Sequence, residues 1–273
     1  MIPEGNVRSN VERFSGYQSL YDKYRPEAPR RVIDLIVAYL GKRPSLVVDV
    51  GCGTGLSSFA WVGHADRIIG VEPNADMISR AREKLAHTDG ADTISFVPGY
   101  SNQLELESGT VDVITCSQSF HWMEPASTLK EASRVLTEGG IFAAYDCDWP
   151  PTVHWTLEAV YNNLLGKADA VLAGLTKEED RAWKRNKEQH LQQLKESGRF
   201  RFTKEIVFHN IEPCDADRYS GLAISQGGVQ TVIKLGSTEL DEDIATFKRL
   251  TEQYFQGRTL DVLFSYRMRL GVK

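Results

Sequence analysis

The sequence has only four cysteines in 273 residues, and no two of them form a C-x-x-C pair. Structural zinc sites and small disulfide-stabilised domains both depend on closely spaced cysteines. We therefore expect neither a metal site nor a disulfide framework. Cys52, Cys116 and Cys147 lie at or near the ends of apolar runs, where a small apolar side chain packs well.

Long apolar runs and excess positive charge are also absent. No stretch reaches the roughly 18 apolar residues that a membrane span needs, and the first residues lack a basic region followed by an apolar segment. The net charge is −5, which gives no general attraction to phosphate backbones or anionic lipids. We therefore expect a cytoplasmic protein without nucleic-acid or membrane partners. The sequence carries no signal about oligomeric state.

The clearest positive signal is an apolar run that ends in three glycines. Leu46–Val50 is typical of a buried strand, Gly51, Gly53 and Gly55 follow it, and a helix is expected from Leu56. Glycines allow positive φ angles and let the backbone approach a ligand closely. The stretch therefore predicts a strand, a ligand-binding loop and a helix.

Two kinds of ligand could occupy such a loop. A dinucleotide needs G-x-G-x-x-G/A, with no side chain at the third position, but Leu56 or Ser58 stands there. Asp49, just before the loop, would repel a pyrophosphate and attract an ammonium group. The sequence therefore favours a ligand with a positive charge at this point.

A second predicted strand, residues 68–73, contains Glu72, 19 residues after Gly53. An acid about 20 residues past a glycine loop can accept hydrogen bonds from ribose hydroxyls. A nucleoside that carries an amino acid ammonium group and no pyrophosphate describes S-adenosylmethionine, which is the cofactor we expect.

Three segments, 47–55, 70–74 and 112–124, resemble the class I S-adenosylmethionine-dependent methyltransferases. The resemblance implies an α/β fold with a doubly wound, seven-stranded, mostly parallel sheet and a helical substrate cap. It suggests a cofactor-binding domain with an N-terminal helical lid over residues 1–148, a helical cap insertion over 149–198, and strands and helices that complete the sheet and cap over 199–273. The string from Gln118 to Trp122 also resembles the trans-aconitate methyltransferase-like group of small-molecule enzymes. The Asn-Pro-Pro-Tyr string of many amino-methylating relatives is missing.

The resemblance also implies a set of cofactor-binding residues. An aromatic stripe near the N-terminus is either a helix docked on the sheet or a lid over the cofactor; in the second case Arg25 would pair with the methionine carboxylate. Ser101 and Asn102 stand where many relatives carry an acid that holds the adenine amino group. The expected cofactor-binding residues are Tyr17, Tyr21, Arg25, Asp49, Gly51, Gly53, Gly55, Glu72, Pro73, Ser101, Asn102, Ser117 and Gln118.

The loop after the predicted strand 111–116 is the best candidate for catalysis, because ligands of open α/β sheets bind beyond the carboxyl ends of the strands. His121 and Gln118 are the expected catalytic residues, and His121, Trp122, Trp149 and His154 the expected substrate contacts. His121 would serve as a base for a hydroxyl substrate or would orient a carboxylate. The simpler alternatives are a helix-capping role for His121 and a packing role for Trp122.

The remaining sequence predicts helices over 155–165, 168–175 and 177–194, strands over 200–210 and 259–272, and a turn at Gly227–Gly228. The function we expect is methyl transfer to an oxygen of a small molecule. Methylation of carbon or nitrogen in a secondary metabolite, and cofactor binding without turnover, are the alternatives.

Overall fold

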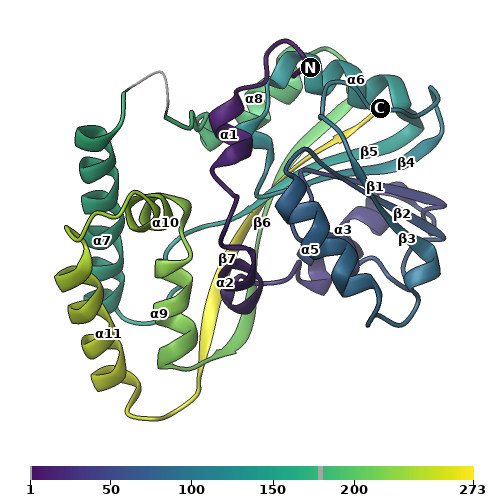
Figure 1. Ribbon diagram of the computed structural model, residues 1–273. Helices are drawn as coiled ribbons and strands as arrows, with labels where there is room; N and C mark the ends of the chain where they lie inside the picture. The colour runs from purple at the N-terminus through teal and green to yellow at the C-terminus, as the bar shows by residue number, and fades with distance from the viewer. Residues whose placement is uncertain (1, 178–180) are drawn as a thin grey trace.

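The computed structural model describes residues 2–177 and 181–273, and its centre is a seven-stranded sheet (Figure 1). The strand order is β3-β2-β1-β4-β5-β7-β6; the first five strands are parallel, and β7 runs antiparallel to both of its neighbours. The predicted doubly wound, mostly parallel sheet is thus confirmed. The strands are β1 (Leu46–Val50), β2 (Arg67–Glu72), β3 (Ile94–Pro98), β4 (Val111–Ser117), β5 (Leu136–Cys147), β6 (Phe202–Cys214) and β7 (Leu260–Val272).

Two apolar cores form on the two faces of this sheet, because successive side chains of a strand point to opposite sides. Val47 belongs to the core that α3 and α5 cover, and Val48 to the core that α6 and α8 cover. These helices are α3 (Arg30–Leu40), α5 (Ala75–Leu85), α6 (Pro125–Val135) and α8 (His190–Glu196), and the shorter ones nearby are α4 (Leu56–Phe59), η1 (Ala91–Thr93), η2 (Phe120–Trp122) and η4 (Lys187–Gln189).

Four further helices, here called the cap helices, pack against one another beside the long strands β6 and β7 (Figure 1). Buried aromatic rings join them: Tyr161, Tyr219 and Phe247 meet with ring centroids about 6 Å apart. The cap helices are α7 (Trp155–Leu175), α9 (Ala216–Ile224), α10 (Gly227–Lys234) and α11 (Asp241–Phe255). Two short N-terminal helices, α1 (Arg8–Glu12) and α2 (Gln18–Tyr24), lie between the cap helices and the sheet.

Two expectations for the cap helices were wrong. The segment predicted as two helices, 155–165 and 168–175, is the single helix α7, because its buried side chains continue at helical spacing from Leu157 to Val171. The segment predicted as a turn at Gly227–Gly228 instead begins α10, a helix whose Val229 and Val232 are fully buried.

The helix predicted over 177–194 is also wrong for most of its length; residues 178–180 lie outside the described residues. Residues 181–186, here called the strap, are not helical, and helical structure begins only at η4. The strap bonds to distant segments instead of to itself: Ser9 Oγ donates to the Arg181 carbonyl oxygen, and the Arg185 N–H donates to the His121 carbonyl oxygen. Tertiary hydrogen bonds have therefore overridden local helix propensity.

Within the described residues, no helix combines the length and apolar character that crossing a bilayer requires.

The contact between α2 and α9 leaves no room for a side chain at Gly221. A Cβ there would lie 2.2 Å from Cδ1 of Tyr24, whose hydroxyl donates to Asp217. We predict that Gly221→Ala lowers the free energy of unfolding by about 1–3 kcal/mol, because the Tyr24 ring must move. Chemical denaturation measures the change. Gly166→Ala in α7, which meets nothing within 4 Å, is the control and should raise stability by about 0.5–1 kcal/mol; equal effects would contradict the packing explanation.

Candidate functional site

The glycine loop between β1 and α4 has the geometry that the sequence suggested. Gly51, Gly53 and Gly55 all have positive φ angles, of 68°, 56° and 84°. A Cβ at Gly51 would lie 2.7 Å from Cβ of Ser119, and one at Gly55 would lie 2.7 Å from the Phe96 ring, whereas a Cβ at Gly53 would meet nothing within 4 Å. Gly51 and Gly55 are therefore required by packing, and Gly53 leaves open space beside a pocket.

Asp49 lies under this loop, and it does not face a ligand as expected. Its carboxylate is fully buried and accepts hydrogen bonds from three hydroxyl groups: those of Ser57 and Ser58, at 2.6 Å each, and that of Thr115, at 2.8 Å. Burial raises the pKa of Asp49 and the three hydroxyls oppose that shift. Asp49 thus ties β1 to α4 and β4, and it is not among the residues that line the pocket.

Glu72 ends β2 and faces the other side of the loop. Its Oε2 accepts from the Gly53 N–H at 2.9 Å, and its Oε1 accepts from the Asn74 N–H at 2.8 Å. Only 8% of the residue is exposed. Burial raises the pKa of Glu72 to about 7, although the two backbone donors lower it. Each carboxylate oxygen keeps one free lone pair for a further donor.

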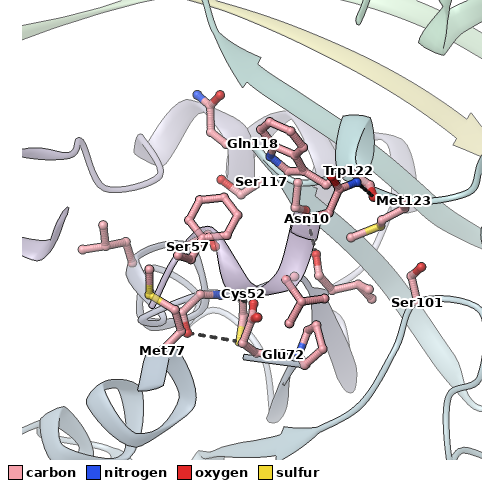
Figure 2. Close-up of a pocket in the computed structure, with 18 of the residues that line it drawn as sticks. Asn10, Cys52, Ser57, Glu72, Met77, Ser101, Ser117, Gln118, Trp122 and Met123 are labelled. Atoms are coloured by element: carbon pink, nitrogen blue, oxygen red, sulfur yellow. Dashed lines mark hydrogen bonds between the residues drawn. The ribbon is translucent and has the colours of Figure 1, made fainter. Parts of the chain in front are cut away.

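The pocket lies at the carboxyl ends of the parallel strands, and α1 and α2 close its outer side. It holds about 1170 Å³ of space, part of it open to solvent. Figure 2 shows Glu72, Cys52 and Met77 at one end and Gln118 and Trp122 at the other. The predicted site residues that line it are Tyr21, Arg25, Gly51, Gly53, Glu72, Pro73, Ser101, Ser117, Gln118, Trp122 and Trp149.

Arg25 is the cation of this pocket. Its guanidinium lies 4.9 Å from the Trp149 ring centroid and 5.3 Å from that of Tyr21, and it donates to the Ser225 carbonyl oxygen and to Gln226. Its Nε is buried without a hydrogen-bond partner, and no carboxylate of the described residues forms an ion pair with it. The group is therefore placed to receive an anion.

The other predicted site residues lie outside the pocket lining. Gly55 packs on Phe96, Asn102 donates to the Glu4 carbonyl oxygen, and His154 caps α7 by accepting from the Thr156 N–H. The Tyr17 ring is buried beneath the Lys234 ammonium group, 4.3 Å from it. Asn102 thus holds the N-terminal segment in place and does not contact the pocket.

Sequence reasoning missed several lining residues, among them Asn10, whose amide forms three hydrogen bonds. The Asn10 amide donates to the carbonyl oxygens of Trp122 and Trp183 and accepts from the Trp183 N–H at 2.7 Å. One side chain thus joins α1, η2 and the strap. A lone asparagine in a short helix gives no sequence signal of this role. Other missed lining residues are Phe14, Ser57, Met77, Tyr145 and Tyr266.

His121 faces away from the pocket, into a buried charged cluster around Asp146. Its Nδ1 lies 3.3 Å from Oδ1 of Asp146, and the same carboxylate is approached by Lys187 at 2.7 Å, Arg269 at 3.4 Å and His190 at 3.6 Å. Although burial opposes the shift, the adjacent His121 ring and the Lys187 ammonium group hold the pKa of Asp146 well below its usual range. Burial lowers the pKa of His121 to about 3 and that of His190 to about 4, so both rings are neutral near pH 7.

The buried histidines predict a loss of stability in mild acid. In the unfolded chain His190 becomes protonated below about pH 6.5, whereas in the folded protein its pKa is about 4. The free energy of unfolding should therefore fall by about 2 kcal/mol between pH 7 and pH 5 because of this residue. His190→Leu should remove that share of the pH dependence in denaturant titrations. His87→Leu, at an exposed histidine, is the control. An unchanged slope in the His190 variant would contradict the prediction.

Comparison with known proteins shows that the segment carrying the glycine loop and Glu72 resembles a known domain. Residues 48–144 match the family model described as "Methyltransferase domain". A methyltransferase-like protein of Schizosaccharomyces pombe is 30% identical over 149 residues, which are 54% of this chain and 55% of the relative. A Saccharomyces cerevisiae protein named as a probable S-adenosylmethionine-dependent methyltransferase is 28% identical over 125 residues, 45% of this chain and 43% of the relative. The chain spans about half the length of the curated relatives it matches.

The fold comparison extends over more of the chain. The solved structure of an Anaeromyxobacter dehalogenans protein assigned to the type II methyltransferases matches with a TM-score of 0.67 and 20% identity, covering 91% of this chain and 98% of that one. Residues 48–144 thus match a methyltransferase domain, and the sheet that contains them has the Rossmann-like fold of solved methyltransferase structures.

Proposed function

We propose that this protein is an S-adenosylmethionine-dependent methyltransferase that acts on a small molecule, at an oxygen of a carboxylate or hydroxyl group. The observation that carries the proposal is the pairing of Glu72 with the glycine loop. A buried carboxylate with two free lone pairs and a loop without side chains lie at one end of a single pocket. The match to a methyltransferase domain supports it.

The residues present fit S-adenosylmethionine. Glu72 would accept from the two ribose hydroxyls, as acids at this place in open α/β sheets do. Gly53, where a Cβ would meet open space, would let the amino acid portion approach the backbone. Arg25, with its unpartnered Nε, would receive the carboxylate. Met77 and Pro73 offer apolar surface to the adenine.

When bound, S-adenosylmethionine supplies a methyl group on a positively charged sulfur. The residues of this chain have to hold the acceptor oxygen in line with that group and exclude water, and positioning of this kind contributes on the order of 7 kcal/mol or more. A carboxylate acceptor has no proton to lose, so no base is required. Trp122 and Gln118, at the far end of the pocket from Glu72, would orient it.

A hydroxyl acceptor would require a base, the role predicted for His121. The ring of His121 is 4% exposed, is absent from the pocket lining and has its pKa lowered to about 3 by burial. This geometry favours a carboxylate acceptor, with His121 as a positioning residue behind Trp122, whose ring centroid is 4.7 Å away. Trans-aconitate methyltransferase-like enzymes, which the string from Gln118 to Trp122 resembles, remain the proposed subgroup.

Two alternatives are carried by the same pocket: transfer to carbon or nitrogen, and cofactor binding without turnover. Calorimetry with S-adenosylhomocysteine, followed by incubation of the protein with methyl-labelled cofactor and a cell extract, separates them. We expect binding and a labelled, alkali-labile methyl ester. A labelled amine would favour nitrogen transfer, binding without any labelled product would favour the binder, and absence of binding would refute the cofactor assignment.

The raised pKa of Glu72 predicts proton release on cofactor binding. In the protein without cofactor, the Glu72 carboxyl group is largely protonated at pH 6. In the complex, where it accepts hydrogen bonds from the ribose hydroxyls, it is ionised. Affinity for S-adenosylhomocysteine should therefore rise about tenfold from pH 6 to pH 8 and then level off. Calorimetry at pH 6 in two buffers of different ionisation enthalpy should count close to one released proton.

Glu72→Gln should abolish the proton release. It should also weaken the binding of S-adenosylhomocysteine at pH 8 by about 10- to 100-fold, because hydrogen bonds to a charged group are lost. Glu105→Gln, at an exposed carboxylate, should leave both quantities unchanged. A proton count that survives in the Glu72 variant would show that another group titrates.

A further inference from the structure

Gln118 occupies an unusual backbone position at the end of β4. Its φ is 53°, one of two positive values at non-glycine residues in the described chain, and such values are uncommon outside glycine. Its N–H donates to the Tyr145 carbonyl oxygen at 2.9 Å, and its side chain lines the pocket at the end away from Glu72 (Figure 2). The fold thus holds this side chain at the substrate end against a local conformational cost.

Lys187 fixes which way the Gln118 amide faces. Its Nζ lies 2.7 Å from Oδ1 of Asp146 and donates to Oε1 of Gln118 at 3.3 Å. An ammonium group has donors only, so the carbonyl oxygen of the amide must face it and the NH₂ group must point elsewhere. Within the described residues, that NH₂ group has no hydrogen-bond partner.

Asp146 in turn holds Lys187. Its carboxylate is 2% exposed and also contacts Arg269, which Glu205 neutralises in part. The Lys187 charge is therefore balanced by Asp146, and the NH₂ group of Gln118, a neutral donor, is the one left without a partner among the described residues. Lys187 directly follows the strap, so the strap delivers this residue to the site.

Tyr266 supplies a second donor from β7. It lines the same pocket, is 2% exposed and stacks on Phe208 with ring centroids 5.5 Å apart. Its hydroxyl is buried and has no hydrogen-bond partner among the described residues. Burial raises the pKa of Tyr266 well above its usual value, so the hydroxyl keeps its proton. Unpaired buried polar groups are rare in proteins, so the hydroxyl of this pocket-lining residue is available to donate to a ligand.

We propose that Gln118 and Tyr266 are specificity-determining donors, with Lys187 and Asp146 as positioning residues, and that the substrate therefore carries an oxygen acceptor group such as a carboxylate. The inference rests on the proposed function of the pocket. It requires that the acceptor end of the substrate lies against the end of β4 and the middle of β7, where Tyr266 pairs with the last residue of β5, and that the cofactor lies against the end of β2. A substrate that offers only donors, such as an alkyl ammonium, would leave both donors unpaired and would be rejected.

The test uses a panel of small carboxylic acids and the matched primary amines, with S-adenosylhomocysteine release as the measure of turnover. Tyr266→Phe and Gln118→Glu keep the shape of each side chain and remove the donor. We expect each to lower kcat/KM for the acids by about 10- to 100-fold, while the Kd for S-adenosylhomocysteine changes less than twofold. Tyr39→Phe, outside the pocket, should match the wild type.

Lys187→Met should raise KM for the acids by a similar factor, because the Gln118 amide is free to turn, and Lys187→Arg should restore most of it by keeping a donor. Lys195→Met, at an exposed lysine of α8, is the matched control. Wild-type kcat/KM in the Tyr266 and Gln118 variants, or turnover of amines but of no acid, would overturn the inference. Absence of S-adenosylhomocysteine binding to the wild type would instead refute the proposed function.

Discussion

The carboxylate of Asp49 is the constraint on which the site depends. Three hydroxyl donors from two elements converge on it, so the first turn of α4 is fixed against β1 and β4, and the glycine loop between them has one path. A buried carboxylate is costly unless it is fully hydrogen-bonded, and here the donors are supplied by the segments that the loop has to join. That path brings the Gly53 N–H to Glu72, so a wholly interior interaction sets the shape of the cofactor end.

The other end of the pocket is assembled from distant parts of the chain. Gln118 directly follows β4, Tyr266 lies in β7, Arg25 directly follows α2, and Lys187 directly follows the strap. Two buried carboxylates thus have similar structural roles. Asp49 holds the glycine loop in place, and Asp146 binds Lys187 and Arg269 behind the substrate end of the pocket. Asp49 lies near the end of β1 and Asp146 near the end of β5. The cofactor end and the substrate end of the pocket therefore lie along the same edge of the sheet.

The sequence allowed the strands, the glycine loop and the place of Glu72 at the tip of β2 to be predicted, because each leaves a local signal: an apolar run, spaced glycines, or an acid at the end of an apolar run. It did not indicate where Asp49 points, because no local pattern tells which side of a loop a carboxylate faces; Ser57, Ser58 and Thr115 decide that only when the chain is folded. Asn10 and Tyr266 could not be found, since their roles arise from contacts with segments more than one hundred residues away or from burial. The strap was predicted as helix because its charges alternate, whereas its backbone is satisfied by α1 and η2.

The hydrogen bonds of Asn10 have a consequence for how the segments around the pocket can move. Its amide bonds to the strap on one side and to η2 on the other, so α1, η2 and the strap are held together by one side chain. Outward movement of any one of these three segments would therefore break hydrogen bonds of this single side chain, so their movements are coupled.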